Sequence, residues 1–113
     1  PAYKVGYVNA QRVIRESTTS KKAQQLLEDE FAKREKEIAG GPAREAPRRH
    51  SALVADMTQR RDEALKKIVD RADAIIRRIA EAVRFDIVLY EAAYVGPQAD
   101  LTERVMKALD EGR

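Results

Sequence analysis

Few side chains in this sequence have the types and the spacing that catalysis or metal binding requires. His50 is the only histidine, and it follows two arginines without a partner spaced for acid–base work or metal binding. Glu28, Asp29 and Glu30 are adjacent, but on a helix their carboxylates diverge, and the loop glycine of a calcium site is missing. The chain has no cysteine and no glycine motif for phosphates or dinucleotides. We therefore predict no enzyme, no metal site and no cofactor, and we expect His50 to be solvated.

Arginines are the clearest candidates for binding. Arg60 and Arg61 are adjacent, and neighbouring guanidinium groups can bind phosphate in a bidentate manner. Residues 44–84 carry eleven basic and seven acidic side chains, whereas residues 85–113 carry three and six. The sequence thus predicts a solvated helical surface, with a site for an anionic headgroup or nucleic acid at the arginines as the alternative. The basic band that these arginines begin continues through Lys66, Lys67, Arg71, Arg77 and Arg78.

The hydrophobic pattern predicts an α+β chain with short strands at both ends and two long helices between them. Tyr3–Val8 and Phe85–Tyr90 are short and rich in β-formers. Asp100 and Glu103 have the spacing of a capping box at the start of a last helix. The predicted order is a strand at 3–8, helices at 10–17, 21–39 and 47–83, strands at 85–90 and 92–95, and a helix from 100.

Residues 38–49, IAGGPAREAPRR, interrupt the helical pattern with two glycines and two prolines. The terminal strands can pair only if the two long helices fold back on one another. A linker between two domains is disfavoured, because each half alone would have too little sheet to be stable. We therefore expect a hairpin tip here and a single domain over 1–113, with a body at 1–20 and 85–113 and a helical arm at 21–84.

The two long helices differ in their apolar faces. In the first, Arg34 interrupts a thin stripe of apolar residues, and it lies one turn from Glu30, which predicts an ion pair along the helix. In the second, a coiled-coil-like heptad begins only at Leu65 and the segment before it is polar. We expect this helix to be packed toward its end and exposed near its start. The predicted core consists of Leu65, Ile68, Ile75, Ile79, Val88 and Val105.

Composition favours an oligomer. The chain has 113 residues, of which 36% are charged and only 5% aromatic, so a monomer would bury little core. Tyrosines 3, 7, 90 and 94 fall in the predicted strands, which favours a sheet core or a subunit interface. No run approaches the roughly 18 apolar residues of a membrane span. No signal peptide precedes the first strand, which indicates a cytosolic protein or a mature chain without its leader.

Four segments, in the right order, resemble the Skp/OmpH family of periplasmic chaperones. They are VNAQRVIRES, LEDEFAKREKEI, QRRDEALKKIVDRADAIIRRIAE and FDIVLYEAAYVGPQADLTERVMKAL, and the resemblance covers about residues 3–39 and 57–110. It implies a periplasmic homotrimer whose strands form a central body. Helical hairpins, the tentacles, hang from that body and enclose a cavity for unfolded outer-membrane proteins. It also implies lipopolysaccharide binding by basic tentacle residues, to which Arg60 and Arg61 correspond by position.

The resemblance therefore predicts an ATP-independent holdase chaperone without a cofactor. Its partners would be copies of itself, unfolded outer-membrane proteins, and lipopolysaccharide or an anionic membrane surface, with nucleic acid disfavoured. Two alternatives stay open: a basic lipopolysaccharide- or nucleic-acid-binding protein, and a structural trimerisation module without chaperone activity. The sequence departs from the family at 38–49. At about 1.5 Å per residue, arms of roughly 28 and 55 Å cannot pair throughout, so the tentacle is naturally short, engineered or incomplete.

Overall fold

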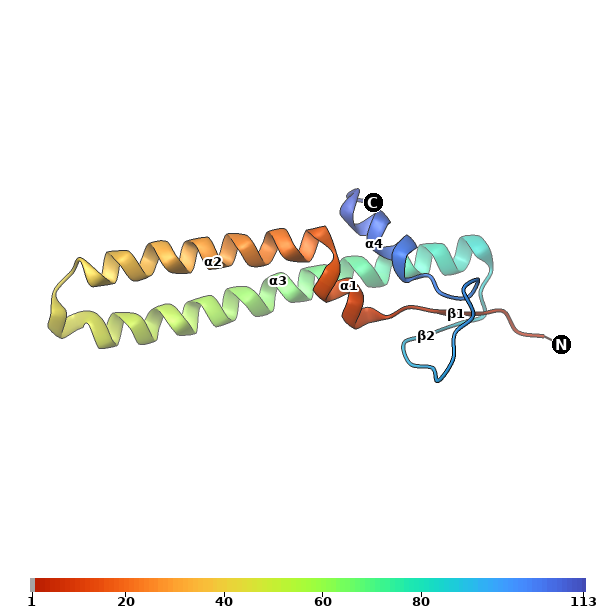
Figure 1. Ribbon diagram of the computed structural model, residues 1–113, viewed down its shortest axis with the longest axis horizontal. Coiled ribbons are helices and arrows are strands. Elements are labelled where there is room, and N and C mark those ends of the chain that lie inside the picture. The colour runs from red at the N-terminus through yellow and green to blue at the C-terminus, as the bar shows by residue number, and fades with distance from the viewer. Residues whose placement is uncertain (1) are drawn as a thin grey trace.

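The computed structural model describes residues 2–113 as an elongated molecule of 70 × 26 × 19 Å (Figure 1). Two long helices run side by side, and a small sheet and two shorter helices gather at one end of them. The elements are β1 (Val5–Tyr7), α1 (Ala10–Glu16), α2 (Thr18–Ala39), a 3-10 turn (Ala43–Glu45), α3 (Ala46–Val83), β2 (Ile87–Leu89) and α4 (Thr102–Asp110). The predicted long helices are confirmed to within three residues at each end.

The sheet joins the two ends of the chain, as the sequence predicts. β1 and β2 are parallel, with Val5 opposite Ile87 and Tyr7 opposite Leu89. Gly6 lies between them in a tight position, because a Cβ there would stand 3.0 Å from a methyl group of Leu101. The strands are therefore held against the chain that leads into α4.

The predicted third strand at 92–95 is wrong. The other edge of β1 is occupied by residues 99–101: the Tyr7 N–H donates to the Ala99 carbonyl at 2.7 Å, and the Leu101 N–H donates to the Tyr7 carbonyl at 2.7 Å. A single bridge between Tyr7 and Asp100 results. Residues 92–95 are left in an irregular loop, where the side chain of Tyr94 is 85% exposed.

The hydrophobic core lies where the end of α3 meets α1, α4 and β1. Of the predicted core residues, Ile68, Ile75, Ile79 and Val105 are buried, and Val88 is partly buried against them. Leu65 was predicted wrongly, because it is 41% exposed. The core begins at Ile68, and Leu65 lies just before it, where a groove opens between α2 and α3. The whole cluster comprises Val8, Val13, Ile68, Ala72, Ile75, Ile76, Ile79, Leu101, Val105 and Leu109.

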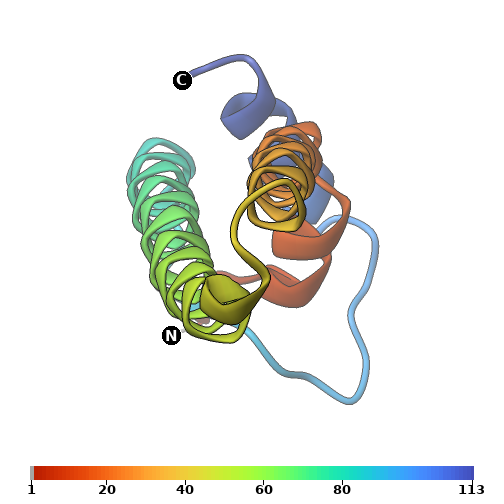
Figure 2. The ribbon, with the colours of Figure 1, turned by 90° about the vertical axis from the view of Figure 1, so that its left-hand side faces the viewer.

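Helix α3 therefore has two surroundings along its length. Its first half lies beside α2, and its second half packs into the core with α1 and α4 (Figures 1 and 2). The excess length of α3 over α2 is thus accounted for, since it extends past α2 into the core. The start of α3 is less exposed than predicted: Leu53 is 1% exposed and Met57 is buried between the two helices.

The glycines and prolines at 38–49 explain where the two long helices end and begin. α2 ends at Ala39, Gly40 and Gly41 turn the chain, and Pro47 lies in the first turn of α3, where its missing N–H leaves no hydrogen bond unmade. Within the described residues, the connection between the helices is only six residues long, from 40 to 45. The segment is therefore a compact reversal of the chain.

Side chains cap the helix ends near the base of α2, some of them from distant parts of the chain. Asn9 accepts from the Arg12 N–H at 3.1 Å and caps α1. The capping box at Asp100 is wrong: α4 begins at Thr102, whose N–H and hydroxyl both donate to the Asp100 carboxylate. At the other end of α4, the Asp110 carboxylate accepts from the Thr18 and Thr19 N–H groups at 3.1 and 2.9 Å. This side chain ties α4 to the start of α2.

Candidate functional site

The structure places Arg60 and Arg61 on different sides of α3, because neighbouring residues on a helix do not share a face. Arg60 faces α2 and forms an ion pair with Glu30. The hydrogen bond from Arg60 lowers the pKa of Glu30, and the same bond raises the pKa of Arg60. Arg61 is exposed and lines the groove between the two helices. The two guanidinium groups therefore do not form a joint fork on one face.

A second ion pair crosses between the helices nearer the tip. Arg34 interrupts the apolar stripe of α2, and its guanidinium binds the carboxylate of Asp56 on α3 and contacts the Met57 sulfur at 3.9 Å. The predicted pair between Glu30 and Arg34 along α2 is wrong, since each of them pairs with α3 instead. Arg34 and Arg60 thus lie between the two helices, and each forms an ion pair with a carboxylate of the other helix.

Other residues of the basic band bind different partners within the chain. Lys66 lies 3.9 Å from the Asp70 carboxylate on the same helix. Arg71 and Arg78 donate to the backbone carbonyls of Leu109 and Arg113 at 3.0 and 2.7 Å, so they hold α4 and the following residues against α3. The band is consequently not one continuous surface for a polyanion.

An apolar groove of about 610 Å³ lies between α2 and α3, between the core and the tip. Leu27 and Phe31 of α2 line one side, and Val54 and Leu65 of α3, both more than 40% exposed, line the other. Arg61 stands among the polar lining residues. Leu27 and Phe31 are four residues apart on the apolar stripe of α2. The sequence analysis missed Val54, although Leu53 and Met57 beside it are four residues apart and in phase with Ala64 and Ile68.

His50 lies in the first turns of α3, close to the tip. Its side chain is half exposed, as the prediction of a solvated residue implies, but it also contacts α2. The imidazole packs edge-on against the Phe31 ring, with 6.4 Å between ring centroids, and its Nε2 lies 3.7 Å from the Glu35 carboxylate. His50 therefore helps to hold the tip of the helix pair together.

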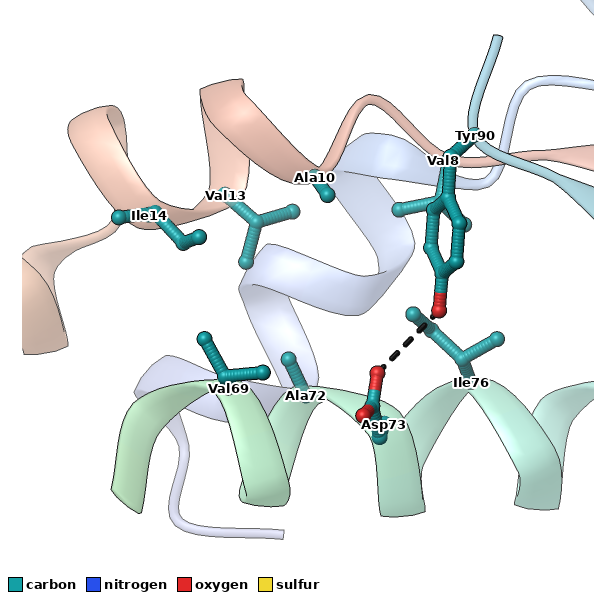
Figure 3. A pocket seen from close by; sticks show the side chains of 9 residues that line it. All are labelled: Val8, Ala10, Val13, Ile14, Val69, Ala72, Asp73, Ile76 and Tyr90. Atoms are coloured by element: carbon teal, nitrogen blue, oxygen red, sulfur yellow. Dashed lines mark hydrogen bonds between the residues drawn. The ribbon is translucent and has the colours of Figure 1, made fainter. Parts of the chain in front are cut away.

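A smaller cavity of about 270 Å³ opens beside the sheet, between α1 and α3 (Figure 3). Its lining is aliphatic except for Tyr90 and Asp73, and the Tyr90 hydroxyl donates to Asp73 at 3.2 Å across its mouth. Partial burial, followed by the charge of Asp73, raises the pKa of Tyr90. Tyr90 follows β2 and is the only tyrosine that lines a described cavity.

The outward face of the sheet is apolar and uncovered in the single chain. Val5, Ile87 and Leu89 lie on it, and each is about 40–47% exposed. Tyr3 and Tyr94 are exposed near the ends of this region, so the prediction that tyrosines form the sheet core is wrong for the single chain. The predicted alternative, a subunit interface, is consistent with an apolar face that residues 2–113 leave exposed.

Two further properties bear on function. Within residues 2–113, no cluster of three histidine or carboxylate side chains is arranged to hold a metal ion. Among the helices described, none is long and apolar enough to cross a membrane.

The comparisons with known proteins identify one family. A family model described as "Outer membrane protein (OmpH-like)" matches residues 43–109. The match begins at the turn between the long helices and runs through α3, β2 and nearly all of α4. A search of curated proteins finds no significant match to this chain.

Proposed function

The chain belongs to the OmpH-like family of outer membrane proteins, and we propose that it is an ATP-independent holdase chaperone that binds unfolded outer-membrane proteins in the periplasm. The observation that carries this proposal is the family match over 43–109, which is more than half of the chain. The exposed apolar surfaces of the structure, the groove between α2 and α3 and the outward sheet face, are suited to binding and support the proposal.

Holding a client in a cavity requires several copies of the chain. We propose a homotrimer in which the outward sheet face, with Val5, Ile87 and Leu89, packs against its counterparts. These apolar side chains are exposed in the single chain, and burying them would release about 25 cal/mol per Å². The helix pairs, formed by α2 and the first half of α3, would then project from a shared body and surround a space.

The mechanism would be confinement by weak contacts. The groove between α2 and α3 offers an apolar surface for exposed client side chains, and each further helix pair offers another. Several weak contacts in one enclosed space add through a high effective concentration, so the client stays bound while no single contact is strong. Basic residues on α3 would attract acidic clients from a distance.

The test measures assembly and activity on the same samples. Light scattering should return three times the 12.8 kDa of one chain, and a several-fold excess of trimer should suppress aggregation of an unfolded outer-membrane protein. Ile87→Lys places a charge in the proposed interface and should abolish both. Leu26→Lys is the matched control, because Leu26 is exposed on α2 away from the sheet, and it should assemble normally.

Each outcome decides between functions. A stable monomer of the unmodified chain would overturn the trimer. A stable trimer that fails to suppress aggregation would overturn the chaperone and support a structural trimerisation module.

Lipopolysaccharide binding through Arg60 and Arg61 is a second candidate function. The observation that favours it is the exposed guanidinium of Arg61 beside the apolar groove. An anion at Arg60 would have to compete with Glu30. We therefore expect Arg61→Ala to weaken lipopolysaccharide binding several-fold and Arg60→Ala to weaken it less, with both effects reduced by salt. Equal binding by both variants and the unmodified chain would exclude this site.

A further inference from the structure

A further cleft lies near the C-terminal end of α3, away from Arg60, where α3 meets α4. It has a volume of about 430 Å³, within the range of small-ligand sites. Its floor is apolar and comes from Ile75, Ile79 and Ala82 of α3 and from Ala108 of α4. None of these residues belongs to the groove between α2 and α3, so the two sites are separate.

The rim of this cleft is strongly cationic. Arg78 comes from α3, Arg104 and Lys107 lie three residues apart on α4, and Arg113 follows α4. Among the lining residues described, Glu111 is the single acid, and its carboxylate is engaged by Arg113 at 3.2 Å. Within residues 2–113, Arg104 and Lys107 form no ion pair. The side chains of the rim therefore carry a net positive charge, contributed mainly by Arg104 and Lys107, although the C-terminal part of the chain is acidic overall.

One of the rim side chains is already positioned by the fold. Arg78 donates one N–H to the Arg113 carbonyl at 2.7 Å, which fixes the guanidinium at the edge of the cleft. A guanidinium has five N–H donors, so others remain for a ligand. Arg78, the last residue of the basic band predicted from the sequence, thus lines the same cleft as Arg104 and Lys107 of α4.

We infer that this cleft binds an anionic amphiphile, that is, a phosphate or carboxylate head joined to a hydrocarbon chain. The cations would take the head through charge-assisted hydrogen bonds, and the aliphatic floor would take the first carbons of the chain. A nucleic acid is disfavoured, because no aromatic side chain lines the cleft for base stacking. A purely hydrophilic anion would leave the apolar floor unused. This inference does not rest on the proposed chaperone activity.

The probe is decyl phosphate below its aggregation concentration, titrated into the full-length protein by calorimetry. Inorganic phosphate tests the head alone, and an uncharged decyl glycoside tests the chain alone. We expect decyl phosphate to bind at least tenfold more tightly than either. Arg104→Gln with Lys107→Gln should weaken its binding at least tenfold. The matched control is Lys21→Gln with Lys22→Gln, which removes the same charge from exposed positions on α2 and should change binding less than threefold.

The alternatives give distinct results. Equal losses in the two double variants would overturn the site and indicate attraction by net charge. Inorganic phosphate binding as tightly as decyl phosphate would remove the role of the floor, and equal binding of the glycoside would remove the role of the cations. Loss in an Arg60→Gln, Arg61→Gln variant, without loss in the α4 variant, would overturn the site and place the ligand at the groove between α2 and α3. Circular dichroism of each variant establishes that it is folded.

Discussion

The body and the helix pair are stabilised in different ways. In the body, ten buried apolar residues from α1, α3, α4, the residue after β1 and the segment before α4 form one cluster. Beyond this cluster, Leu53 and Met57 are buried between two helices only, and ion pairs at Arg34 and Arg60 stand beside them. Apolar burial is worth more than exposed ion pairs. The difference indicates that the body holds most of the stability and that the helix pair depends on it.

Helix α3 connects these two regions without a break. It contributes five residues to the core and then continues beside α2, so the body fixes the direction in which the helix pair projects. At the base, the Asp110 carboxylate binds the first N–H groups of α2. Helix α2 is therefore attached to the body as well as α3. Such an arrangement allows the far end to open locally while its base stays fixed.

The largest effect is expected from a cavity in the body. Ile75 is 1% exposed at the centre of the core, and Ile75→Ala should lower the free energy of unfolding by about 3–4 kcal/mol. Leu65→Ala removes a side chain of similar size that is 41% exposed, so its cost should stay below about 1 kcal/mol. Urea unfolding followed by circular dichroism measures both. Equal losses would mean that Leu65 is buried in the assembled protein.

A cavity in the helix pair should act more locally. Leu53 is as deeply buried as Ile75, but only α2 and α3 surround it, so Leu53→Ala should cost about 2 kcal/mol. Hydrogen exchange should accelerate for residues near the tip, while amides in the core of the body keep their protection. Uniform acceleration along the whole chain would show that the two regions unfold as one unit and would contradict the comparison.

The sequence predicted the body better than the helix pair, for a physical reason. The heptad from Ile68 onward reports burial by several elements at once, and those residues are indeed in the core. In the helix pair, long polar side chains also reach across between the helices, as Arg34 does to Asp56 and Arg60 does to Glu30. A hydrophobic pattern does not register such contacts, so the partners of Arg34 and Glu30 were missed.

Other errors arose where partners are distant in the sequence. The segment at 92–95 has strand-like residues, but residues 99–101 occupy the edge of β1 instead. Local propensity does not reveal which of two segments will pair with a strand that is distant in the sequence. The link between Asp110 and the start of α2 spans more than 90 residues and has no sequence signal. The family resemblance was found from the order of the motifs and is confirmed by the match over 43–109.

The attachment of α2 to the body should be sensitive to acid. Partial burial tends to raise the pKa of Asp110, but hydrogen bonds from Thr19 and Thr18 outweigh it and hold the pKa below its ordinary value. A lowered folded pKa stabilises the fold above the unfolded pKa of about 3.9, and this stabilisation is lost as pH falls through the folded value. Asp110→Asn should cost about 1 kcal/mol at pH 7, because the amide nitrogen that replaces one carboxylate oxygen cannot accept a hydrogen bond from the start of α2.

The pH profile separates this effect from a general loss of packing. Between pH 5 and pH 3 the urea midpoint of the unmodified chain should fall, and in Asp110→Asn it should fall less. The pH dependence that remains in Asp110→Asn comes from other carboxylates with lowered pKa values. One of them is Asp100, whose pKa is lowered mainly by the hydrogen bond from the Thr102 hydroxyl. If the two profiles run parallel, the Asp110 contact contributes nothing in solution.

The smallest effect is expected from the ion pair between Arg34 and Asp56. Both side chains are about 34–44% exposed, and pairs of this kind contribute about 0.2–1 kcal/mol. A double-mutant cycle with Arg34→Ala and Asp56→Ala measures their coupling, which should fall further in 0.5 M salt because exposed charges are screened. Arg34 also contacts Met57, so Arg34→Ala alone should cost more than Asp56→Ala alone. A coupling above 2 kcal/mol would place a dominant polar contact in the helix pair, and the contrast with the apolar body would then no longer hold.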